Sequence, residues 1–262
     1  MLLTGIICGC WRINDLGKMI ENWPTIYVMA VLFFATFVRS AFGFGEALIA
    51  VPLLALIMPV DVAAPVAVLI SITVAVVVLA QDWRHVHVRS ASWLVLSTLV
   101  GTPLGLLLLS KVNGEIVKAC LGTLIVAFSS YSLLRRKKGA LTDDKWAWTF
   151  GFAAGVLGGA YGMNGPPLVM YGTLRGWSPA HFRATLQGYF LPASLMSMTG
   201  YWLAGLWRPE VTHYYLIALP VVVVAIFLGR ATNGRLDGYS FLRCIHFGLV
   251  AIGAMLMYQA FA

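Results

Sequence analysis

A long apolar run near the start of the chain is interrupted by Arg39-Ser40-Ala41-Phe42-Gly43-Phe44-Gly45-Glu46, which contains two glycines and two charged residues. At the α-helical rise of about 1.5 Å per residue, the flanking segments 24–41 and 47–58 predict helices of about 25 Å and about 18 Å. Together these helices exceed the roughly 30 Å hydrocarbon core of a bilayer, and the second is too short to cross it alone. The stretch therefore predicts a helix that enters a membrane, breaks at depth inside protein or beside a wet cavity, and then returns or kinks sharply.

A second polar break, Ala160-Tyr161-Gly162-Met163-Asn164-Gly165-Pro166-Pro167, matches the first. A shift of 119 residues aligns Ala41-Phe42-Gly43 with Ala160-Tyr161-Gly162, and a shift of 124 aligns Trp83-Arg84 with Trp207-Arg208. These matches indicate an internal repeat. The predicted organisation is a tail at 1–23, a first membrane repeat at 24–134, a basic linker at 135–145 and a second membrane repeat at 146–262.

The composition is that of a polytopic membrane protein, because 60% of the 262 residues are hydrophobic and 11% are charged. Apolar runs long enough to cross a bilayer lie at 62–81, 91–110, 116–134, 179–204, 211–229 and 240–261. The fold class predicted is therefore an all-α polytopic membrane protein of two repeats. Each repeat consists of a glycine-broken, re-entrant helix segment followed by three transmembrane helices.

The charge of the loops favours inverted repeats. If both breaks are re-entrant, one side of the membrane receives the loops 81–90, 135–145, 174–184 and 229–243. These loops hold twelve Lys and Arg residues, against five in the tail and the remaining loops. Such an excess is typical of the cytoplasmic side. If both broken segments cross the bilayer fully, the halves are parallel and most of this bias disappears.

Glycines at helical spacing predict two closely packed segments. Gly101 and Gly105 lie four residues apart in one apolar run, and Gly151, Gly155 and Gly159 recur every four residues before the second break. Small residues at this spacing let membrane helices approach closely. We expect them to serve packing and not chemistry.

The charge and cysteine content exclude several function classes. The net charge of +8 is concentrated in short loops beside the apolar runs, above all Arg135-Arg136-Lys137-Lys138, so no nucleic-acid partner is expected. The sequence contains no phosphate-binding loop of an ATPase. No cluster of Cys, His, Asp or Glu predicts a metal site, and no cofactor is expected. The expected surroundings are a lipid bilayer, and the sequence leaves room for an oligomer.

Arg39 and Glu46 are the only fully charged residues deep in an apolar run. An arginine at the centre of a membrane helix costs roughly 2.5–3.5 kcal/mol on insertion scales, so it is normally paired or functional. In one interpretation the two residues only neutralise each other across the break. In the other, Arg39 presents its forked donors to an anionic substrate, while Glu46 caps the following helix or carries a coupling proton.

Each break also predicts a new helix whose first N–H groups carry partial positive charge and attract anions. Two such helix starts are expected to meet near the middle of the membrane. The candidate substrate-binding residues are Arg39, Gly43, Phe44, Gly45, Gly162, Met163, Asn164, Gly165 and Gln187. Ser71, Thr73 and Thr185 are further candidates on neighbouring segments, for which hydrogen bonding between helices is the alternative.

These motifs resemble a known family. Gly43-Phe44-Gly45 followed by Val51-Pro52-Leu53-Leu54, and Gly158-Gly159-Ala160-Tyr161-Gly162 followed by Pro166-Pro167-Leu168, are similar to the repeated signature of the sulfite exporter TauE/SafE family. Leu174-Arg175-Gly176-Trp177-Ser178-Pro179 resembles the link that follows the second broken segment in that family. The resemblance covers about residues 25–260. It implies a secondary transporter that exports sulfite or a small organosulfonate, such as sulfoacetate, across a bacterial inner membrane by alternating access.

Two departures from the family pattern bear on the site. Family members often have glycine where Phe44 and Glu46 stand here, and Glu46 has no acidic counterpart in the second copy, so the ligand set of this chain can differ. Other function classes also remain open. The alternatives are an anion channel, a permease for another small carboxylate or oxyanion, and an integral membrane enzyme. A channel would conduct without a coupling ion, and an enzyme would change its substrate chemically. We expect no enzymatic activity.

Overall fold

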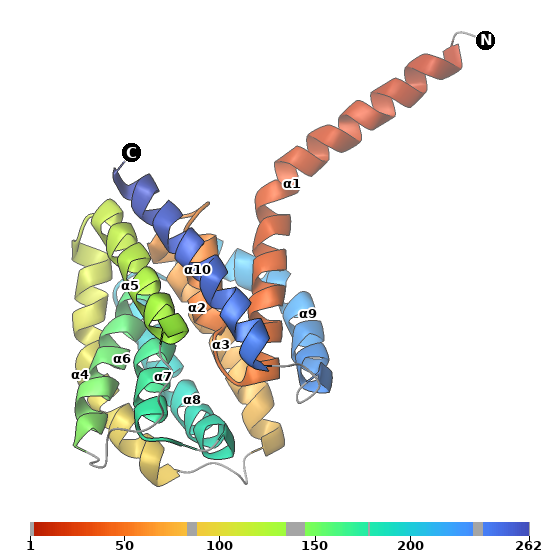
Figure 1. Cartoon of the computed structure of the whole chain (residues 1–262). Helices are drawn as coiled ribbons and strands as arrows, with labels where there is room; N and C mark the ends of the chain where they lie inside the picture. Colours follow the sequence, from red (N-terminus) through yellow and green to blue (C-terminus); the bar gives the residue numbers. More distant parts are fainter. Residues whose placement is uncertain (1–2, 83–87, 135–144, 178, 233–237, 262) are drawn as a thin grey trace.

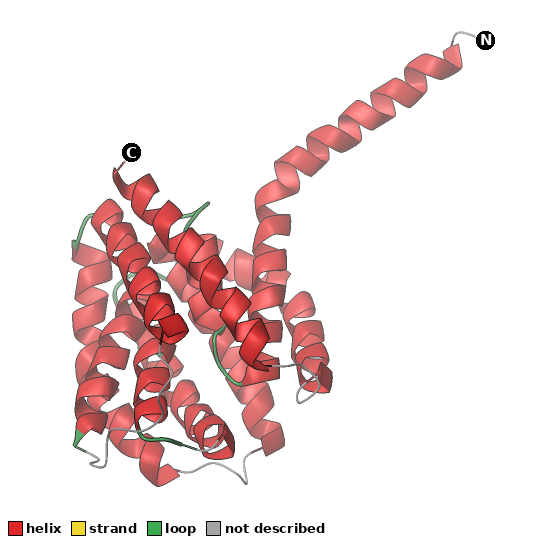
Figure 2. Ribbon diagram, in the orientation of Figure 1, coloured by secondary structure: helices red, strands yellow, loops and turns green. Residues whose placement is uncertain are grey.

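The computed structural model describes the backbone of residues 3–82, 88–134, 145–177, 179–232 and 238–261. Within these ranges the chain forms ten helices and no strand (Figures 1 and 2). The helices are α1 (Leu3–Phe42), α2 (Glu46–Leu54), α3 (Val60–Asp82), α4 (Val88–Lys111), α5 (Gly114–Leu134), α6 (Trp146–Tyr161), α7 (Gly165–Leu174), α8 (Pro179–Leu203), α9 (Pro209–Thr232) and α10 (Gly238–Phe261). The expected linker lies outside the described residues except for Lys145.

Several of these helices are long and apolar enough to cross a membrane. Among the described residues, five segments qualify: Trp23–Phe42, Val60–Val78, Ser92–Lys111, Gly114–Leu134 and Pro209–Thr232. Ile245–Phe261 is a shorter apolar stretch of α10, and several side chains of α8 and α10 lie outside the described part of the chain. The all-helical, multi-pass membrane class predicted from the sequence is confirmed.

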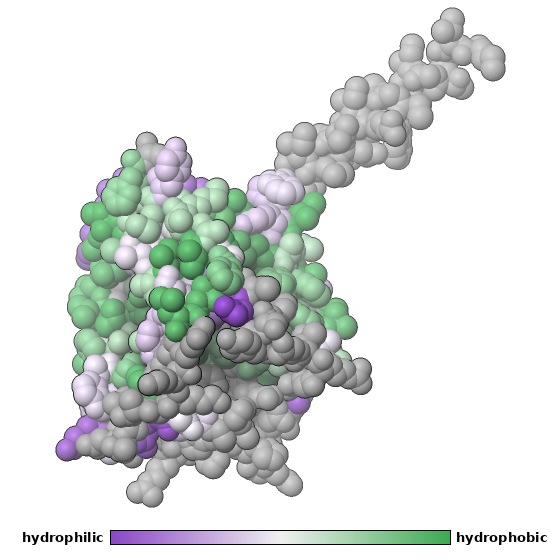
Figure 3. Space-filling model, in the orientation of Figure 1, coloured by the Kyte–Doolittle hydropathy of each residue, from purple (hydrophilic) through white to green (hydrophobic). Residues whose placement is uncertain are grey.

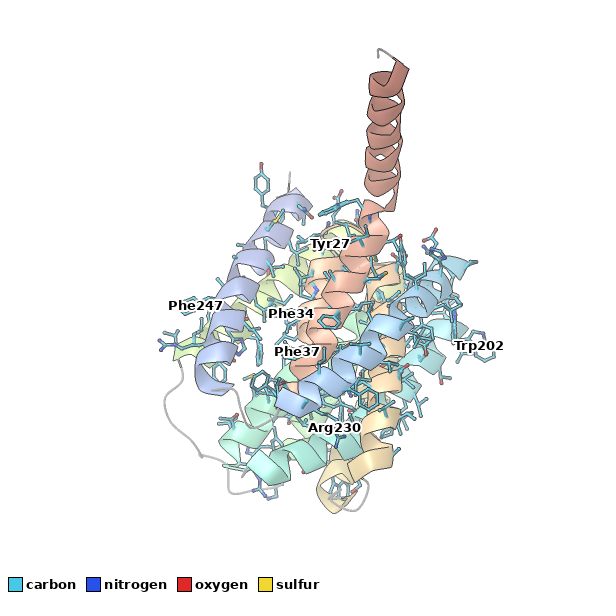
Figure 4. The ribbon with its side chains drawn as sticks, turned by 90° about the vertical axis from the view of Figure 1, so that its right-hand side faces the viewer. Tyr27, Phe34, Phe37, Trp202, Arg230 and Phe247 are labelled. Atoms are coloured by element: carbon cyan, nitrogen blue, oxygen red, sulfur yellow. The ribbon has the colours of Figure 1, made fainter. Side chains whose placement is uncertain are left out.

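The outside of the helix bundle is apolar, as a bilayer requires. Hydrophobic side chains cover most of the coloured face in Figure 3. The exposed aromatic side chains include Phe34 on α1, Trp202 on α8 and Phe247 on α10, which Figure 4 labels. In water such a surface would be an aggregation hazard, whereas in a membrane it faces acyl chains.

The first break folds the chain into a helical hairpin. Gly43 and Gly45 have φ angles of 88° and 102°, a left-handed conformation that glycine adopts without strain and other residues rarely adopt. The Tyr27 hydroxyl, early in the membrane segment of α1, donates a hydrogen bond of 3.0 Å to the carbonyl oxygen of Leu53 near the end of α2. Because the end of α2 lies beside the beginning of that segment, α2 runs back along α1.

The second break forms a hairpin in the same way. Gly162 ends α6 with a φ angle of 66°, and α7 begins with Gly165-Pro166-Pro167. Proline suits the first turn of a helix, where its missing N–H is not needed. The rings of Phe150 on α6 and Tyr171 on α7 lie with their centroids 5.5 Å apart. Helix α7 therefore runs back along α6.

Glycines bring α4 and α6 into backbone contact, as their spacing predicted. An added Cβ would lie 2.3 Å from the Phe152 carbonyl oxygen at Gly101 and 2.2 Å from the Thr102 carbonyl oxygen at Gly159. Neither position admits a larger side chain without moving a helix. This contact fixes the hairpin α6–α7 against α4.

The N-terminal stretch expected as a tail is helical, since α1 begins at Leu3. Its first part projects away from the bundle in Figure 1. The remaining division of the chain into two membrane repeats and a linker stays a prediction at this point.

Candidate functional site

The two breaks border one small cavity. Its lining residues come from both hairpins and from the helices around them. The first break contributes Arg39, Phe44, Gly45 and Glu46, and the second contributes Gly162, Asn164, Gly165 and Pro166. The rest of the lining is Ala47, Leu48, Ser71, Phe128, Val169, Phe190 and Ser194. The cavity volume of about 20 Å³ is enough for about one water molecule. The structure thus brings together most of the residues that the sequence singled out.

A buried ion pair crosses the first break. Arg39 and Glu46 are only 3% and 2% exposed, and Arg39 Nη1 donates to Glu46 Oε2. The same nitrogen donates to Ser71 Oγ at 2.5 Å, and the Ser194 hydroxyl donates to Ser71 Oγ at 3.3 Å. One guanidinium nitrogen therefore ties together α1, α2 and α3, with α8 joined through Ser194.

The other edge of the guanidinium has no partner among the described residues. Arg39 Nε and Nη2 are buried without a hydrogen-bond acceptor, and Glu46 Oε1 is buried without a donor. In a planar guanidinium, Nε–H and one N–H of Nη2 point the same way, so this edge can donate two parallel bonds to two oxygens of one oxyanion. Buried donors left without acceptors are costly. An anionic ligand would satisfy them.

Phe190 on α8 holds the guanidinium from one face. The Cζ atom of Arg39 lies 4.9 Å from the centroid of the Phe190 ring, a distance at which the ring quadrupole attracts a cation. Phe190 and Ser194 lie one helical turn apart on α8, which explains why both border the cavity. Sequence reasoning missed both residues, because an apolar ring and a lone serine in an apolar run carry no signal of their own.

Two helix N-termini also border the cavity. Helix α2 starts at Glu46 after Gly45, and α7 starts at Gly165 after Asn164; neither preceding residue makes a side-chain capping bond. The first N–H groups of such helices carry partial positive charge. The cavity therefore combines one guanidinium with two helix starts, as the sequence predicted.

Asn164 fits beside the cavity because the residue one turn before the break, Gly158, has no side chain. Asn164 is 6% exposed, and a Cβ added at Gly158 would lie 2.2 Å from its Oδ1 atom. The Tyr201 hydroxyl on α8 donates to the Gly158 carbonyl oxygen at 2.9 Å, which fixes this turn of α6. Gly158 thus makes the space that the amide of Asn164 occupies.

Other predicted residues lie elsewhere. Gly43 is buried in the break beside the cavity, and Met163 is fully buried in the hydrophobic core; neither belongs to the lining. The backbone of Gln187 lies in α8, but its side chain is outside the described part of the chain. Thr73 shares a hydrogen bond of 2.9 Å with the Tyr215 hydroxyl, and Thr185 is buried. Substrate binding by these residues stays a prediction.

The chemistry of the cavity lining is compatible with a small anion. No group of three or more His, Cys, Asp or Glu residues that could hold a metal ion occurs in the described part of the chain. The donors that face the cavity are a guanidinium, hydroxyls, an amide and backbone N–H groups, while the remaining wall is apolar and aromatic. Such a lining binds a small anion with an apolar part more readily than it binds a cation.

Comparisons with known proteins cover almost the whole chain. The sequence profile of the family described as "Sulfite exporter TauE/SafE" matches residues 28–257, a range that includes both breaks and the entire cavity lining. A curated protein of Cupriavidus necator, named "Probable sulfite/organosulfonate exporter TauE", is 25% identical over 246 residues, which are 90% of this chain and 95% of that protein. No solved structure gives a significant match.

Proposed function

The chain belongs to the sulfite exporter TauE/SafE family, and from this premise we propose that it exports a small sulfur oxyanion, either sulfite or a small organosulfonate such as sulfoacetate. Family membership makes it a membrane transporter with a small anionic substrate. The proposed location is the inner membrane of a bacterium. The similar protein of Cupriavidus necator, which is named a probable exporter of sulfite and organosulfonates, supports this substrate class.

The observation that carries the proposal is the open edge of Arg39. Its Nε and Nη2 groups are buried and lack acceptors among the described residues. A sulfite or sulfonate group has three oxygens, so two can accept from this edge while the third lies toward Asn164 and the start of α7. Glu46 and Ser71 occupy the opposite nitrogen and hold the guanidinium in place.

The apolar wall of the cavity supports an organic substrate as well as sulfite. Phe44, Phe128, Phe190 and Val169 line it beside the charged groups. The short carbon chain of a sulfonate would bury apolar area against these rings, which is favourable by roughly 25 cal/mol per Å². In this proposal the sulfonate oxygens give the orientation and the rings contact the carbon chain.

We also propose that the two halves are inverted repeats with re-entrant hairpins. Helix α1 packs on α9 as α6 packs on α4, and α3 packs on α9 as α8 packs on α4. Helices α3 and α8 pack on each other, as do α5 and α10. This pattern agrees with a pseudo-two-fold axis that exchanges α1–α5 with α6–α10. The presence of a hairpin that turns back at the start of each half also agrees with this axis.

Hydrogen bonds support the same relation. The Thr73 and Tyr215 hydroxyls join α3 to α9, and the Thr98 and Tyr189 hydroxyls, 2.6 Å apart, join α4 to α8. The two pairs are equivalent under the proposed exchange, because α3 corresponds to α8 and α9 corresponds to α4. Transport by alternating access would then move one half relative to the other around the cavity.

The size of the cavity favours a carrier over an open channel. A channel needs a continuous wet path, whereas this cavity holds about one water molecule. A sulfite ion is larger than a water molecule, so we infer that the helices must part before it enters or leaves. In a carrier, substrate on one side accelerates the release of labelled substrate from the other, which a channel does not do.

The test is flux of labelled sulfite and sulfoacetate in proteoliposomes. Arg39→Ala should abolish flux, because it removes the only guanidinium in the cavity lining. Arg39→Lys should restore flux only in part, because an ammonium lacks the planar fork. The matched control is Arg208→Ala, which breaks an exposed ion pair with Asp61 and should change flux by less than about twofold.

The outcome against the proposal is equally definite. If Arg39→Ala inserts, purifies as a folded protein and transports both substrates as the parent does, the site is wrong. If the parent moves neither anion, the substrate class is wrong. Mass spectrometry of the recovered anion would reveal a chemical change, which an enzyme produces and a transporter does not.

A further inference from the structure

The ion pair at the cavity leaves hydrogen-bonding positions open on both partners. Within the described part of the chain, the Nε and Nη2 groups of Arg39 lack acceptors and Glu46 Oε1 lacks a donor, while Nη1 and Oε2 remain bonded to each other. Among the described residues, Arg39 and Glu46 are the only charged members of the lining, and their formal charges cancel. The open nitrogens fit an oxyanion, and the open oxygen fits a proton.

Charge balance connects these two vacant positions. An oxyanion that binds at Arg39 places a second negative charge beside Glu46, and the cavity then carries net negative charge. Burying an uncompensated charge in a membrane protein is strongly unfavourable. One proton on Glu46 restores neutrality for a singly charged substrate without breaking the bond between Nη1 and Oε2.

Charged and titratable side chains on the helices packed against α2 are the alternative proton carriers. These helices are α1, α3, α5, α7 and α10. In their described side chains, Asp61 pairs with Arg208, Lys118 donates to Gln259, and Glu115 is exposed. The other charged or titratable side chains there are Tyr27, Arg39, Cys120, Tyr131, Tyr171, Arg243, His246 and Tyr258.

His246 is the main rival proton carrier among these groups. Its ring packs on Phe128, with the centroids 5.7 Å apart, and Phe128 lines the cavity. His246 itself does not belong to the lining, whereas Glu46 does and contacts Arg39 directly. The geometry therefore favours Glu46.

We propose that the protein is a proton–anion symporter in which Glu46 is the proton carrier. The inference rests on the proposed function. When an oxyanion binds to the Nε and Nη2 edge of Arg39, Glu46 takes one proton on Oε1 from the water on the side of entry. When the helices part on the other side, the anion and the proton leave together, and the ion pair is again neutral.

This cycle sets the charge that crosses the membrane. A sulfonate with one negative charge crosses with one proton and carries no net charge. Doubly charged sulfite or sulfoacetate crosses with one proton and carries one negative charge, so a membrane potential that is negative inside drives it outward. A pH gradient that is acidic outside opposes the export of every substrate, so a singly charged sulfonate leaves down its own concentration gradient, and the potential acts only on the doubly charged anions.

The experiment uses the full chain in proteoliposomes and labelled ethanesulfonate, a single-charge sulfonate. Exchange without any gradient tests the proposed function. Accumulation driven by a more acidic outside medium, with the potential clamped at zero, tests the inference. For one proton per anion, a difference of about one pH unit supports accumulation of up to about tenfold. A pH dye inside the vesicles should report one proton for each anion taken up.

The variant Glu46→Gln should lose accumulation and proton movement while exchange stays measurable, because an amide oxygen can still accept from Arg39 Nη1 but cannot take the proton. The control Glu115→Gln, at an exposed carboxylate of α5, should keep both activities. Parent protein that exchanges ethanesulfonate without proton movement would overturn the inference and leave the proposed function intact. Absence of exchange of ethanesulfonate, sulfite and sulfoacetate alike in the parent would instead contradict the proposed function.

Two further outcomes are decisive. A folded Glu46→Gln variant that still accumulates ethanesulfonate, or that loses exchange together with accumulation, overturns the role of Glu46 as proton carrier. If this variant cannot be recovered folded, His246→Asn decides between the two candidate carriers. Accumulation that persists in His246→Asn supports Glu46, and its loss assigns the proton to His246.

Discussion

Gly105 on α4 and Gly229 on α9 each lie against the backbone of a helix that leads into a break. A Cβ added at Gly105 would lie 2.0 Å from the carbonyl oxygen of Val156 on α6, and one added at Gly229 would lie 2.6 Å from that of Phe37 on α1. The two glycines are 124 positions apart and the two carbonyls 119 apart, the same two shifts that align one half of the sequence with the other. Each hairpin is thus held by a helix from the other half of the chain.

Replacing either glycine with alanine should destabilise the protein. Gly105→Ala and Gly229→Ala each push a methyl group into a helix backbone, and overpacking of this kind costs about 1–3 kcal/mol. Thermal unfolding of the detergent-solubilised protein should show the loss. Gly248→Ala on α10 is the control, since nothing lies within 4 Å of its added Cβ. Unchanged stability in Gly105→Ala would contradict this description of the contact.

Asn164 should contribute to affinity more than to stability. Its amide borders the cavity, so Asn164→Ala should weaken the apparent affinity for sulfite by the roughly 0.5–1.5 kcal/mol of an ordinary hydrogen bond. Gly158→Ala should weaken it at least as much, because the new methyl group displaces the amide. The concentration dependence of flux measures both effects. Gly114→Ala, where an added Cβ meets nothing, should leave the affinity unchanged.

Phe190 should matter through its ring and not only through its volume. Phe190→Leu keeps an apolar side chain but removes the aromatic face beside the Arg39 guanidinium. Cation–π contacts contribute about 0.5–2 kcal/mol, so the variant should have a weaker apparent affinity with nearly unchanged thermal stability. Phe190→Tyr, which keeps the ring, should stay close to the parent. Equal flux in the leucine and parent proteins at every substrate concentration would argue against this role.

Cysteine labelling tests the proposed orientation of the helices. If both hairpins are re-entrant, Pro59 lies outside and Gly238, at the start of α10, lies inside; if both broken segments cross fully, Gly238 lies outside as well. In a background with the four native cysteines replaced by serine, an impermeant thiol reagent applied to intact cells should label Pro59→Cys but not Gly238→Cys. Labelling after permeabilisation controls for reactivity. Equal labelling of both in intact cells would favour parallel halves and contradict the orientation.

Much of the fold was accessible from the sequence because membrane helices have strong compositional limits. The expected breaks at 39–46 and 160–167 contain the observed last residues of α1 and α6 and the first residues of α2 and α7. The six apolar runs agree closely with helices α3, α4, α5, α8, α9 and α10. The glycine spacing also gave the contact between α4 and α6. The N-terminal stretch was expected as a tail but is helical from Leu3, because a helix can extend beyond the apolar segment that the pattern identifies.

The candidate site was only partly accessible from the sequence. Arg39, Glu46 and Asn164 stood out because polar groups are costly in an apolar run. Phe128, Phe190 and Ser194 border the same cavity, but their contacts depend on how helices from both halves pack, which hydrophobic runs do not specify. Met163 was expected beside Asn164 at the substrate, yet it lies in the core, since neighbouring residues in a turn point in different directions.

The small volume between the two breaks also concerns the electrical behaviour of the membrane. A space that holds about one water molecule cannot contain the row of waters along which protons or ions would pass from one side to the other. A bilayer that carries many copies of this protein should therefore have the same electrical resistance as a bare one when no substrate is present. A membrane that maintains an ion gradient would then not be discharged by this protein at rest.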